Sequence, residues 1–312
     1  CMLTDTELKS ILQHFTCRSV FDCAKVLREP FMLHRDDKSR VYIHFWEQNA
    51  YDANSFQLAR QTTVRGNRSN RYDLLLLING LPLVQIELKR RGADLKEAFY
   101  QIRRYQHDCR AGLYNCLQLF VITNGTDTKY FSNTDHTLAY TDTFYWTDTH
   151  NRRIADLSAF AHTFLKKQHL LEILTHYMVL NASEKLLMVM RPYQIHACKA
   201  LVRHALYTTG NGYIWHTTGS GKTLTAFKAS KLLSACPCVK KVFLLVDRRD
   251  LDVQTCEEFN KLEAGCIDCT DKTDALIFQI QNPAKQLIIT TIQKMSRAVR
   301  LSKYQSCIAK YK

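Results

Sequence analysis

The sequence predicts an α/β protein with two domains. One observation is an apolar hairpin followed by a helix in residues 73–105, and a second is a strand–loop–helix pattern in residues 212–224. The third is that apolar strands and helices continue to alternate afterwards, which is typical of a parallel sheet with helices on both faces. A length of 312 residues also suits two domains.

The chain is expected to divide into three segments. Residues 1–150 are expected to form the first domain, residues 151–185 a helical connector and residues 186–312 the second domain. No linker rich in Gly, Pro or Ser separates the two domains, so we expect them to pack closely.

The composition indicates a globular protein that binds a polyanion. Lys and Arg number 43 against 29 Asp and Glu, which gives a net charge of +14 spread along the chain. The simplest partner is DNA or RNA, although a basic surface that is only solvated would give the same count. No stretch approaches about 20 apolar residues. The first residues do not resemble a signal peptide, and we expect no membrane association.

The twelve cysteines are irregularly spaced. Only Cys236 with Cys238 and Cys266 with Cys269 form close pairs, and a zinc site would need both pairs in suitable geometry. Cysteines at apolar helical positions, such as Cys198, are interpreted as small core residues. A reduced cytoplasmic compartment is the simplest setting.

Short elements precede the hairpin. Residues 4–29 are expected to form one or two helices, with Thr4 or Asp5 as N-cap and Glu7 placed to close a capping box. Residues 65–71 contain three arginines and are interpreted as an exposed loop. These arginines could contact phosphates or could only be solvated.

Residues 73–89 contain the first candidate site. Asn79-Gly80 lies between two apolar runs and supplies the positive φ values that a tight hairpin turn needs. Because side chains alternate along a strand, Glu87 and Lys89 share one face. The turn brings Asp73 roughly level with Glu87, so two carboxylates and an ammonium converge at one end of a buried sheet.

Such groups are costly to bury unless they bind a metal or one another. Asp73 and Glu87 suit Mg²⁺, and Lys89 could polarise or deprotonate an attacking water molecule. The alternative interpretation is an exposed salt bridge between Glu87 and either Lys89 or Arg90.

A helix is predicted directly after the hairpin, with Asp94 as its cap. Its buried stripe consists of apolar residues at helical spacing, namely Leu95, Ala98, Phe99 and Ile102. Gln101 and Tyr105 are one turn apart on a flank of this stripe. They could position DNA or Lys89, or could simply form the solvated edge of an amphipathic helix.

The second candidate site is a phosphate-binding loop. Pro192 opens a helix, residues 212–216 are interpreted as a short strand, and Thr217–Gly221 form a loop before a helix that begins at Lys222. In such a loop the glycines let backbone N–H groups turn inward. Lys222 can then reach the β and γ phosphates, and the Thr223 hydroxyl can ligate Mg²⁺. Apolar runs near residues 241–247 and 286–291 predict further buried strands.

These motifs together resemble two known families of domains. Asp73, thirteen intervening residues and then Glu87-Leu-Lys89 resemble the PD-(D/E)xK nuclease core. Gln194, Thr-Thr-Gly-Ser-Gly-Lys-Thr at 217–223, the segment from Asp247 to Gln254 and Thr290-Thr-Ile-Gln293 resemble the start of a RecA-like superfamily 2 helicase motor. The whole combination resembles the R (motor and endonuclease) subunit of type I restriction enzymes. It includes His216, which stands where the strict Walker A pattern has Gly.

The resemblance implies a function for the site residues. Asp73 and Glu87 would hold Mg²⁺, Lys89 would assist the water molecule or the transition state, and Gln101 and Tyr105 would support the nuclease site. ATP and its Mg²⁺ would be bound by the adenine-contacting Gln194 and by the loop residues Thr218, Gly219, Ser220, Gly221, Lys222 and Thr223. The full protein would join methyltransferase (modification) and specificity subunits, translocate double-stranded DNA with ATP and then cut it.

This sequence departs from the family pattern at one residue and lacks some of the family's later motifs. Tyr72 precedes Asp73 where the name of the nuclease pattern has Pro, and we expect little effect. No Asp-Glu-x-His box follows Thr290 and no second motor domain is present. The chain is therefore expected to be an N-terminal fragment with an incomplete motor, which binds nucleotide poorly and does not translocate by itself.

Two other functions fit the same motifs. One is an ATP-dependent helicase or remodeller whose first domain only binds DNA, and such a domain should tolerate the loss of Glu87 and Lys89. The other is a repair or type III-like helicase–nuclease, which would need different partners.

Overall fold

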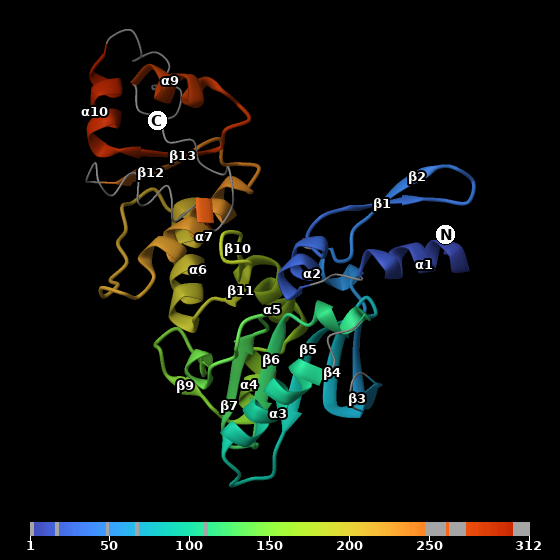
Figure 1. Ribbon diagram of the computed structural model, residues 1–312. Coiled ribbons are helices and arrows are strands. Elements are labelled where there is room, and N and C mark those ends of the chain that lie inside the picture. The colour runs from blue at the N-terminus through green and yellow to red at the C-terminus, as the bar shows by residue number, and fades with distance from the viewer. Residues whose placement is uncertain are drawn as a thin grey trace. The chain divides into compact units, whose positions relative to one another are not determined.

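The computed structural model describes residues 3–15, 19–47, 50–65, 69–108, 112–246, 260–261 and 273–301. The chain forms two compact units (Figure 1). Unit 1 consists of Cys1–Leu180 and Lys185–Tyr193, and unit 2 consists of Asn181–Glu184 and Gln194–Lys312. The expected division at 1–150, 151–185 and 186–312 stays a prediction.

A mixed five-stranded sheet is the centre of unit 1. Its order is β3-β4-β5-β6-β7, formed by Phe56–Arg65, Ser69–Ile78, Leu81–Leu88, Leu119–Thr123 and Thr128–Ser132. Strands β5 and β6 are parallel, and the other neighbouring pairs are antiparallel. The predicted turn between β4 and β5 is confirmed, since Asn79 and Gly80 have φ values of 51° and 81°.

Helix α3 (Leu95–Asp108) connects β5 to β6 and lies across one face of the sheet (Figure 1). The Asp94 carboxylate accepts a hydrogen bond from the Lys96 N–H at 2.9 Å, which caps the first turn as expected. The predicted stripe is buried, and it packs on apolar side chains from β3, β4, β6 and β7 and from the connecting loops. The core includes Val64, Tyr72, Leu75, Leu95, Ala98, Phe99, Ile102, Phe120, Ile122 and Phe131.

The expected exposed loop at residues 65–71 is wrong at both ends. Arg65 is the last residue of β3, and Ser69 is the first residue of β4, opposite it. Arg71 lies within β4 and pairs with Thr63. The ladder extends this far because each paired residue satisfies its backbone polar groups, which outweighs the polar character of the side chains. Residues 66–68 lie outside the described part of the chain.

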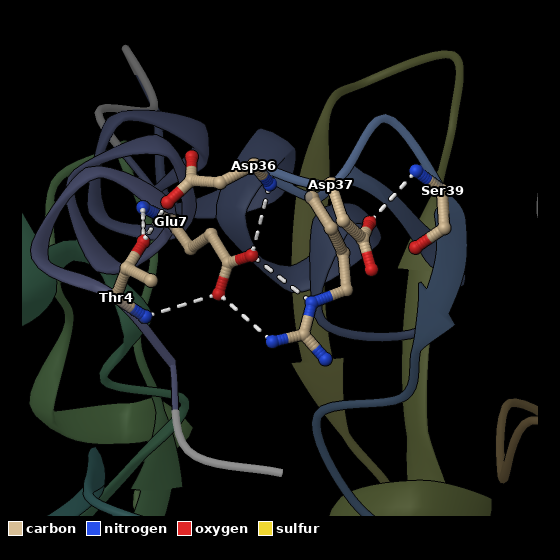
Figure 2. A network of polar contacts seen from close by, with 6 residues as sticks. Thr4, Glu7, Asp36, Asp37 and Ser39 are labelled. Atoms are coloured by element: carbon tan, nitrogen blue, oxygen red, sulfur yellow. Dashed lines mark hydrogen bonds and ion pairs between the residues drawn. The ribbon is translucent and has the colours of Figure 1, made fainter.

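The N-terminal segment contains α1 (Asp5–His14), α2 (Val20–Val26) and an antiparallel hairpin of β1 (Phe31–His34) and β2 (Arg40–Ile43). Thr4 and Glu7 form the predicted capping box of α1. The Glu7 carboxylate also accepts hydrogen bonds from the Arg35 guanidinium at 3.0 Å and from the Asp36 N–H at 3.3 Å (Figure 2). This network ties α1 to the turn of the β1–β2 hairpin.

Short elements complete unit 1. The single-turn helices are η1 (Tyr51–Ala53), η2 (Gly112–Cys116) and η3 (Tyr140–Asp142), and the strand pairs are β8 (Trp146–Thr147) with β9 (Arg153–Ile154) and β10 (Met178–Asn181) with β11 (Leu186–Val189). Helices do occupy much of the expected connector, as α4 (Leu157–Thr163), α5 (Lys167–Glu172) and the π-helix η4 (Ile173–Tyr177). The connector is not wholly helical, because β9 and β10 also lie in it.

Unit 2 contains a parallel pair of strands, β12 (Val242–Val246) and β13 (Leu287–Thr291), as the sequence predicts. Its described helices are α6 (Pro192–Tyr207), α7 (Lys222–Ser234), α9 (Thr273–Gln281) and α10 (Ile292–Arg300). The cysteines at 256, 266, 269 and 307, and the segment from Asp247 to Gln254, lie outside the described residues. No helix in the described ranges is long and apolar enough to cross a lipid bilayer.

The strand predicted at residues 212–216 does not form. These residues have no strand geometry and no ladder partner among the described residues of unit 2. Tyr213 and Trp215 are 89% and 87% exposed. The apolar run Tyr213-Ile214-Trp215 suits a strand, but a strand also needs a neighbour to pair with its backbone, and β12 and β13 pair with each other.

Candidate functional site

Asp73 and Glu87 meet at the end of the β4–β5 hairpin in unit 1. Leu74 pairs with Ile86, which places Asp73 level with Glu87 as the sequence predicts. One Asp73 carboxylate oxygen accepts a hydrogen bond from the Leu88 N–H at 2.9 Å. Glu87 is fully buried and lies on the face that α3 covers, because it pairs with the core residue Ile122. The two carboxylates therefore sit beside each other at one edge of the sheet.

A chain of hydrogen bonds connects Glu87 to helix α3. The Lys89 ammonium donates to Glu87 Oε1 at 3.2 Å and to the side-chain oxygen of Gln101. Gln101 Nε2 donates to the hydroxyl of Tyr105 at 2.8 Å, and that hydroxyl donates to the backbone carbonyl of Arg71 at 3.3 Å. All five residues singled out by the sequence are thus brought together at one site.

The electrostatic environment of Glu87 is unusual for a carboxylate. Burial and the neighbouring Asp73 raise its pKa to about 8, and Lys89 only partly opposes this. The partial burial of Tyr105, and then the charge of Glu87, raise the pKa of the Tyr105 hydroxyl. Glu87 Oε2 is buried and has no hydrogen-bond partner. A second positive charge would reduce the repulsion between the Asp73 and Glu87 carboxylates and would give Glu87 Oε2 a partner.

The donor set at this site fits a small hard cation. Mg²⁺ takes oxygen ligands and commonly uses one or two carboxylates while it keeps several water molecules. Asp73 and the free oxygen of Glu87 supply such ligands. No group of three or more His, Cys, Asp or Glu side chains suited to a metal ion occurs among the described residues. A metal here would therefore rest on two side-chain ligands.

Gln85 is a residue of this site that the sequence did not single out for a role. It lies two positions before Glu87 on the same strand, so both side chains are on the α3 face. Gln85 is buried, and its amide nitrogen has no hydrogen-bond partner. A buried side-chain amide without a hydrogen-bond partner is rare in proteins. The signal in the sequence that could have identified Gln85 is its position two residues before Glu87, which puts both side chains on one face of the strand.

The phosphate-binding loop of unit 2 has the predicted geometry at its helical end. Helix α7 begins at Lys222, and Gly221 before it has a φ of +76°. The Lys222 ammonium donates to the Thr217 carbonyl at 3.1 Å, and the Ser220 hydroxyl donates to the same carbonyl at 2.7 Å. Thr218 and Gly219 are exposed, and Thr223 is half-buried in the first turn of α7. The loop therefore closes around the Thr217 carbonyl.

Gln194 packs against this loop rather than standing apart from it. It is buried on α6, and its amide nitrogen donates to the Ser220 carbonyl at 2.9 Å. A methyl group on Gly221 would lie 2.4 Å from the same nitrogen. A contact of Gln194 with adenine stays a prediction. Glycine is favoured at position 221 by the φ of +76°, since Gln194 Nε2 is the end of a flexible side chain that can move away from an added methyl group.

A cavity of about 500 Å³ adjoins the loop within unit 2. Its lining includes Leu201 and His204 of α6, Tyr213 and Ile214, and Lys222 of α7. Most of these groups are apolar, and Lys222 supplies the positive charge. The shape and chemistry are compatible with a ligand that combines an apolar part and an anion.

Two family models match this chain, one in each half of the sequence. Residues 20–137 match the family described as type I restriction enzyme R protein N terminus. Residues 193–310 match the family described as SWI2/SNF2 ATPase. The first match contains the Asp73–Tyr105 site, and the second contains Gln194 and the phosphate-binding loop.

Individual relatives carry consistent descriptions. The type I restriction enzyme SsaAORF53P endonuclease subunit of Staphylococcus saprophyticus is 49% identical over 298 residues, which are 96% of this chain and 32% of the relative. The EcoprrI endonuclease subunit of Escherichia coli is 43% identical over 172 residues, covering 54% of this chain and 55% of the relative. A Mycoplasma pneumoniae chain described as the C-terminal part of the type I restriction enzyme MpnIIP endonuclease subunit is 39% identical over 166 residues, covering 49% of this chain and 80% of the relative.

The fold and the matches define a restriction-system protein that joins an R-protein N-terminal region to an ATPase-like region. The chain belongs to the endonuclease (R) subunits of type I restriction enzymes. It spans about a third of the length of the staphylococcal relative.

Proposed function

We propose that this chain supplies the nuclease centre and the first part of the ATP-driven motor of a type I restriction endonuclease. The observation that supports it best is the Asp73–Glu87 pair at the end of the hairpin, with Lys89 held between Glu87 and Gln101. On this proposal unit 1 has a PD-(D/E)xK nuclease architecture and unit 2 is an incomplete RecA-like motor domain. The substrate is double-stranded DNA, and the protein acts in the cytoplasm.

At the nuclease centre, Asp73 and the unpartnered oxygen of Glu87 would hold Mg²⁺. A bound Mg²⁺ supplies a Lewis acid at the scissile phosphate and lowers the pKa of a bound water molecule. Lys89 places an ammonium beside these carboxylates, where it can stabilise negative charge that develops on the phosphate or orient the attacking water molecule. Gln101 fixes the direction of the Lys89 ammonium, and Tyr105 fixes Gln101.

At the motor centre, the loop from Thr218 to Thr223 would bind ATP with Mg²⁺. The backbone N–H groups at the start of α7 and the Lys222 ammonium face the same loop, which suits the phosphates. The Thr223 hydroxyl would ligate the metal, and Gln194 would contact the adenine. The complete protein would act with modification and specificity subunits and would translocate DNA before cutting it.

The test is cleavage of circular plasmid DNA by the full-length protein together with modification and specificity subunits, with and without ATP. The wild type should cut only with ATP. Glu87→Ala should consume ATP without cutting, and Lys222→Ala should neither consume ATP nor cut. ATP consumption without any cutting by the wild type would support the alternative, a DNA remodeller whose first domain only binds DNA.

A further inference from the structure

A row of alternating cations and aromatic rings lies on unit 1 outside the five predicted site residues. We name it the cation–tyrosine ladder, and it consists of Lys96, Tyr140, Lys129, Tyr145 and Arg153. The Lys129 ammonium lies 4.5 Å from the ring centre of Tyr140 and 4.9 Å from that of Tyr145. Lys96 lies 5.8 Å from the Tyr140 ring centre, and Arg153 lies 5.1 Å from that of Tyr145. Helix α3, strands β7 and β9, η3 and the loop that carries Tyr145 are thereby joined into one basic surface.

Strand register places this ladder beside the nuclease centre. Glu87 on β5 pairs with Ile122 on β6, and Ile122 pairs with Lys129 on β7. Paired residues of neighbouring strands share a face of the sheet, so Lys129 lies in the same row and on the same face as Glu87. Two strand spacings separate them, which is roughly 10 Å. The ladder therefore begins at a distance suited to a phosphate close to the one being cut.

The charges of the ladder are not balanced by ion pairs. None of its three cations lies within ion-pair distance of a carboxylate in the described part of the chain. Lys129 donates to the Thr143 hydroxyl at 3.2 Å, and Asp127 accepts a hydrogen bond from the Tyr145 hydroxyl at 3.0 Å. Burial and then the nearby Arg153 lower the pKa of Lys129, and the more weakly acting carboxylates of Asp127 and Asp94 only partly oppose this. An anion bound between these cations would relieve their mutual repulsion.

We propose that the cation–tyrosine ladder binds backbone phosphates of double-stranded DNA next to the nuclease centre. This inference rests on the proposed nuclease function and adds a substrate-binding surface to it. Tyr140 and Tyr145 already have cations over their rings, so their role is to hold the cations and not to stack on bases. Contacts of this kind position DNA and carry no sequence information. They suit an enzyme that cuts after translocation.

The test measures binding of a short fluorescent DNA duplex to the full-length protein in EDTA, so that no cleavage occurs, over a series of salt concentrations. In the triple variant Lys96→Gln/Lys129→Gln/Arg153→Gln the affinity at physiological salt should fall by at least about tenfold. The slope of log affinity against log salt should become shallower by about 2 to 3, because each lost phosphate contact removes about 0.9. The matched control is Arg152→Gln, whose guanidinium already pairs with Asp148 at 2.7 Å and should not change the slope.

A second pair of variants tests the role of the rings. Tyr145→Phe keeps the ring over which Lys129 and Arg153 lie, so DNA affinity should stay within about twofold of the wild type. Tyr145→Leu removes the ring, and affinity should fall severalfold. A thermal unfolding profile like that of the wild type shows that each variant is folded.

The outcomes separate this inference from the nuclease assignment. An unchanged salt slope in the triple variant, or an equal loss in Arg152→Gln, would overturn the ladder. Glu87→Gln should still bind the duplex in EDTA, and it should fail to cut circular plasmid DNA in the full reaction with Mg²⁺ and ATP. Cutting by Glu87→Gln would overturn the nuclease assignment and would leave the binding result for the ladder standing.

Discussion

The Lys89 ammonium donates a hydrogen bond to the side-chain oxygen of Gln101, and this contact links the β4–β5 hairpin to helix α3. Lys89 follows the last residue of β5 and is free to adopt many rotamers in an unfolded chain. Its two partners, Glu87 Oε1 and Gln101, select one direction for the ammonium. Preorganised charge of this kind is more effective than mobile charge, because it needs no reorganisation during the reaction.

Lys89→Met should lower the rate of DNA cleavage by at least about 100-fold, which is typical of the loss of one group that stabilises transition-state charge. ATP hydrolysis should stay near the wild-type rate, because Lys222 and its loop belong to the other compact unit. Cleavage and ATP hydrolysis are measured on the same preparation. Lys25→Met, which removes an exposed ammonium paired with Glu29, is the control and should cut normally. Normal cutting by Lys89→Met would contradict the role given to Lys89.

Gln101→Leu should lower cleavage by about 10- to 100-fold. It removes the acceptor of the Lys89 hydrogen bond, and bonds to charged groups contribute about 1.5–3 kcal/mol. Tyr105→Phe removes only the hydroxyl that accepts from Gln101 Nε2, so its loss should be a few-fold. Gln101→Glu keeps an oxygen for Lys89 and should recover part of the rate. Single-turnover cleavage at several pH values checks this order, and an equal rate for Gln101→Leu and the wild type would exclude a positioning role.

The arrangement of these side chains could be predicted from the sequence because each step relates residues that are close together in the chain. Asn79-Gly80 fixes the turn, strand alternation puts Glu87 and Lys89 on one face, and helical spacing puts Gln101 near Tyr105. The contact between Lys89 and Gln101 follows once α3 covers the sheet. Each step depends on a periodicity or a turn that a few residues determine.

Features that depend on tertiary contacts could not be predicted in this way. No periodicity or single turn relates Lys129, Tyr145 and Arg153, and only the pairing of β6 with β7 and the following turns bring them together. Residues 65–71 have a composition that suits a loop, but the backbone pairing of Arg65 with Ser69 extends the strands into this segment. Residues 212–216 show the opposite case, in which a strand-like pattern has no partner strand in the described part of unit 2.

Gly221→Ala should abolish ATP binding and lower stability. A φ of +76° costs a residue with a side chain about 1–2 kcal/mol, and the added methyl group would meet Gln194 Nε2 at 2.4 Å. Binding of a fluorescent ATP analogue and thermal unfolding of the full-length protein measure the two effects.

The double variant Gly221→Ala/Gln194→Ala separates these two causes. It removes the steric contact but keeps the backbone cost, so it should recover only part of the stability. Gly210→Ala is the matched control, because a methyl group there meets no atom within 4 Å and its φ is not positive. Full recovery in the double variant would show that the backbone conformation contributes nothing.

Glu7 should make the N-terminal segment sensitive to acid. Its hydrogen bond with Arg35, together with that from the Thr4 N–H, lowers its pKa below the ordinary value of 4.5, and the Asp36 N–H adds to this (Figure 2). The unfolded segment therefore takes up a proton before the folded one as the pH falls. The stabilisation is present above pH 4.5 and is lost as the pH falls through the lower pKa of the folded state.

Hydrogen exchange of the α1 amides, corrected for intrinsic rates, should show protection that declines below pH 4.5 in the wild type. Glu7→Gln should show weaker protection at neutral pH and little further decline, whereas Glu29→Gln, which removes an exposed carboxylate, should follow the wild type. The same acid decline in Glu7→Gln as in the wild type would assign the effect to other groups.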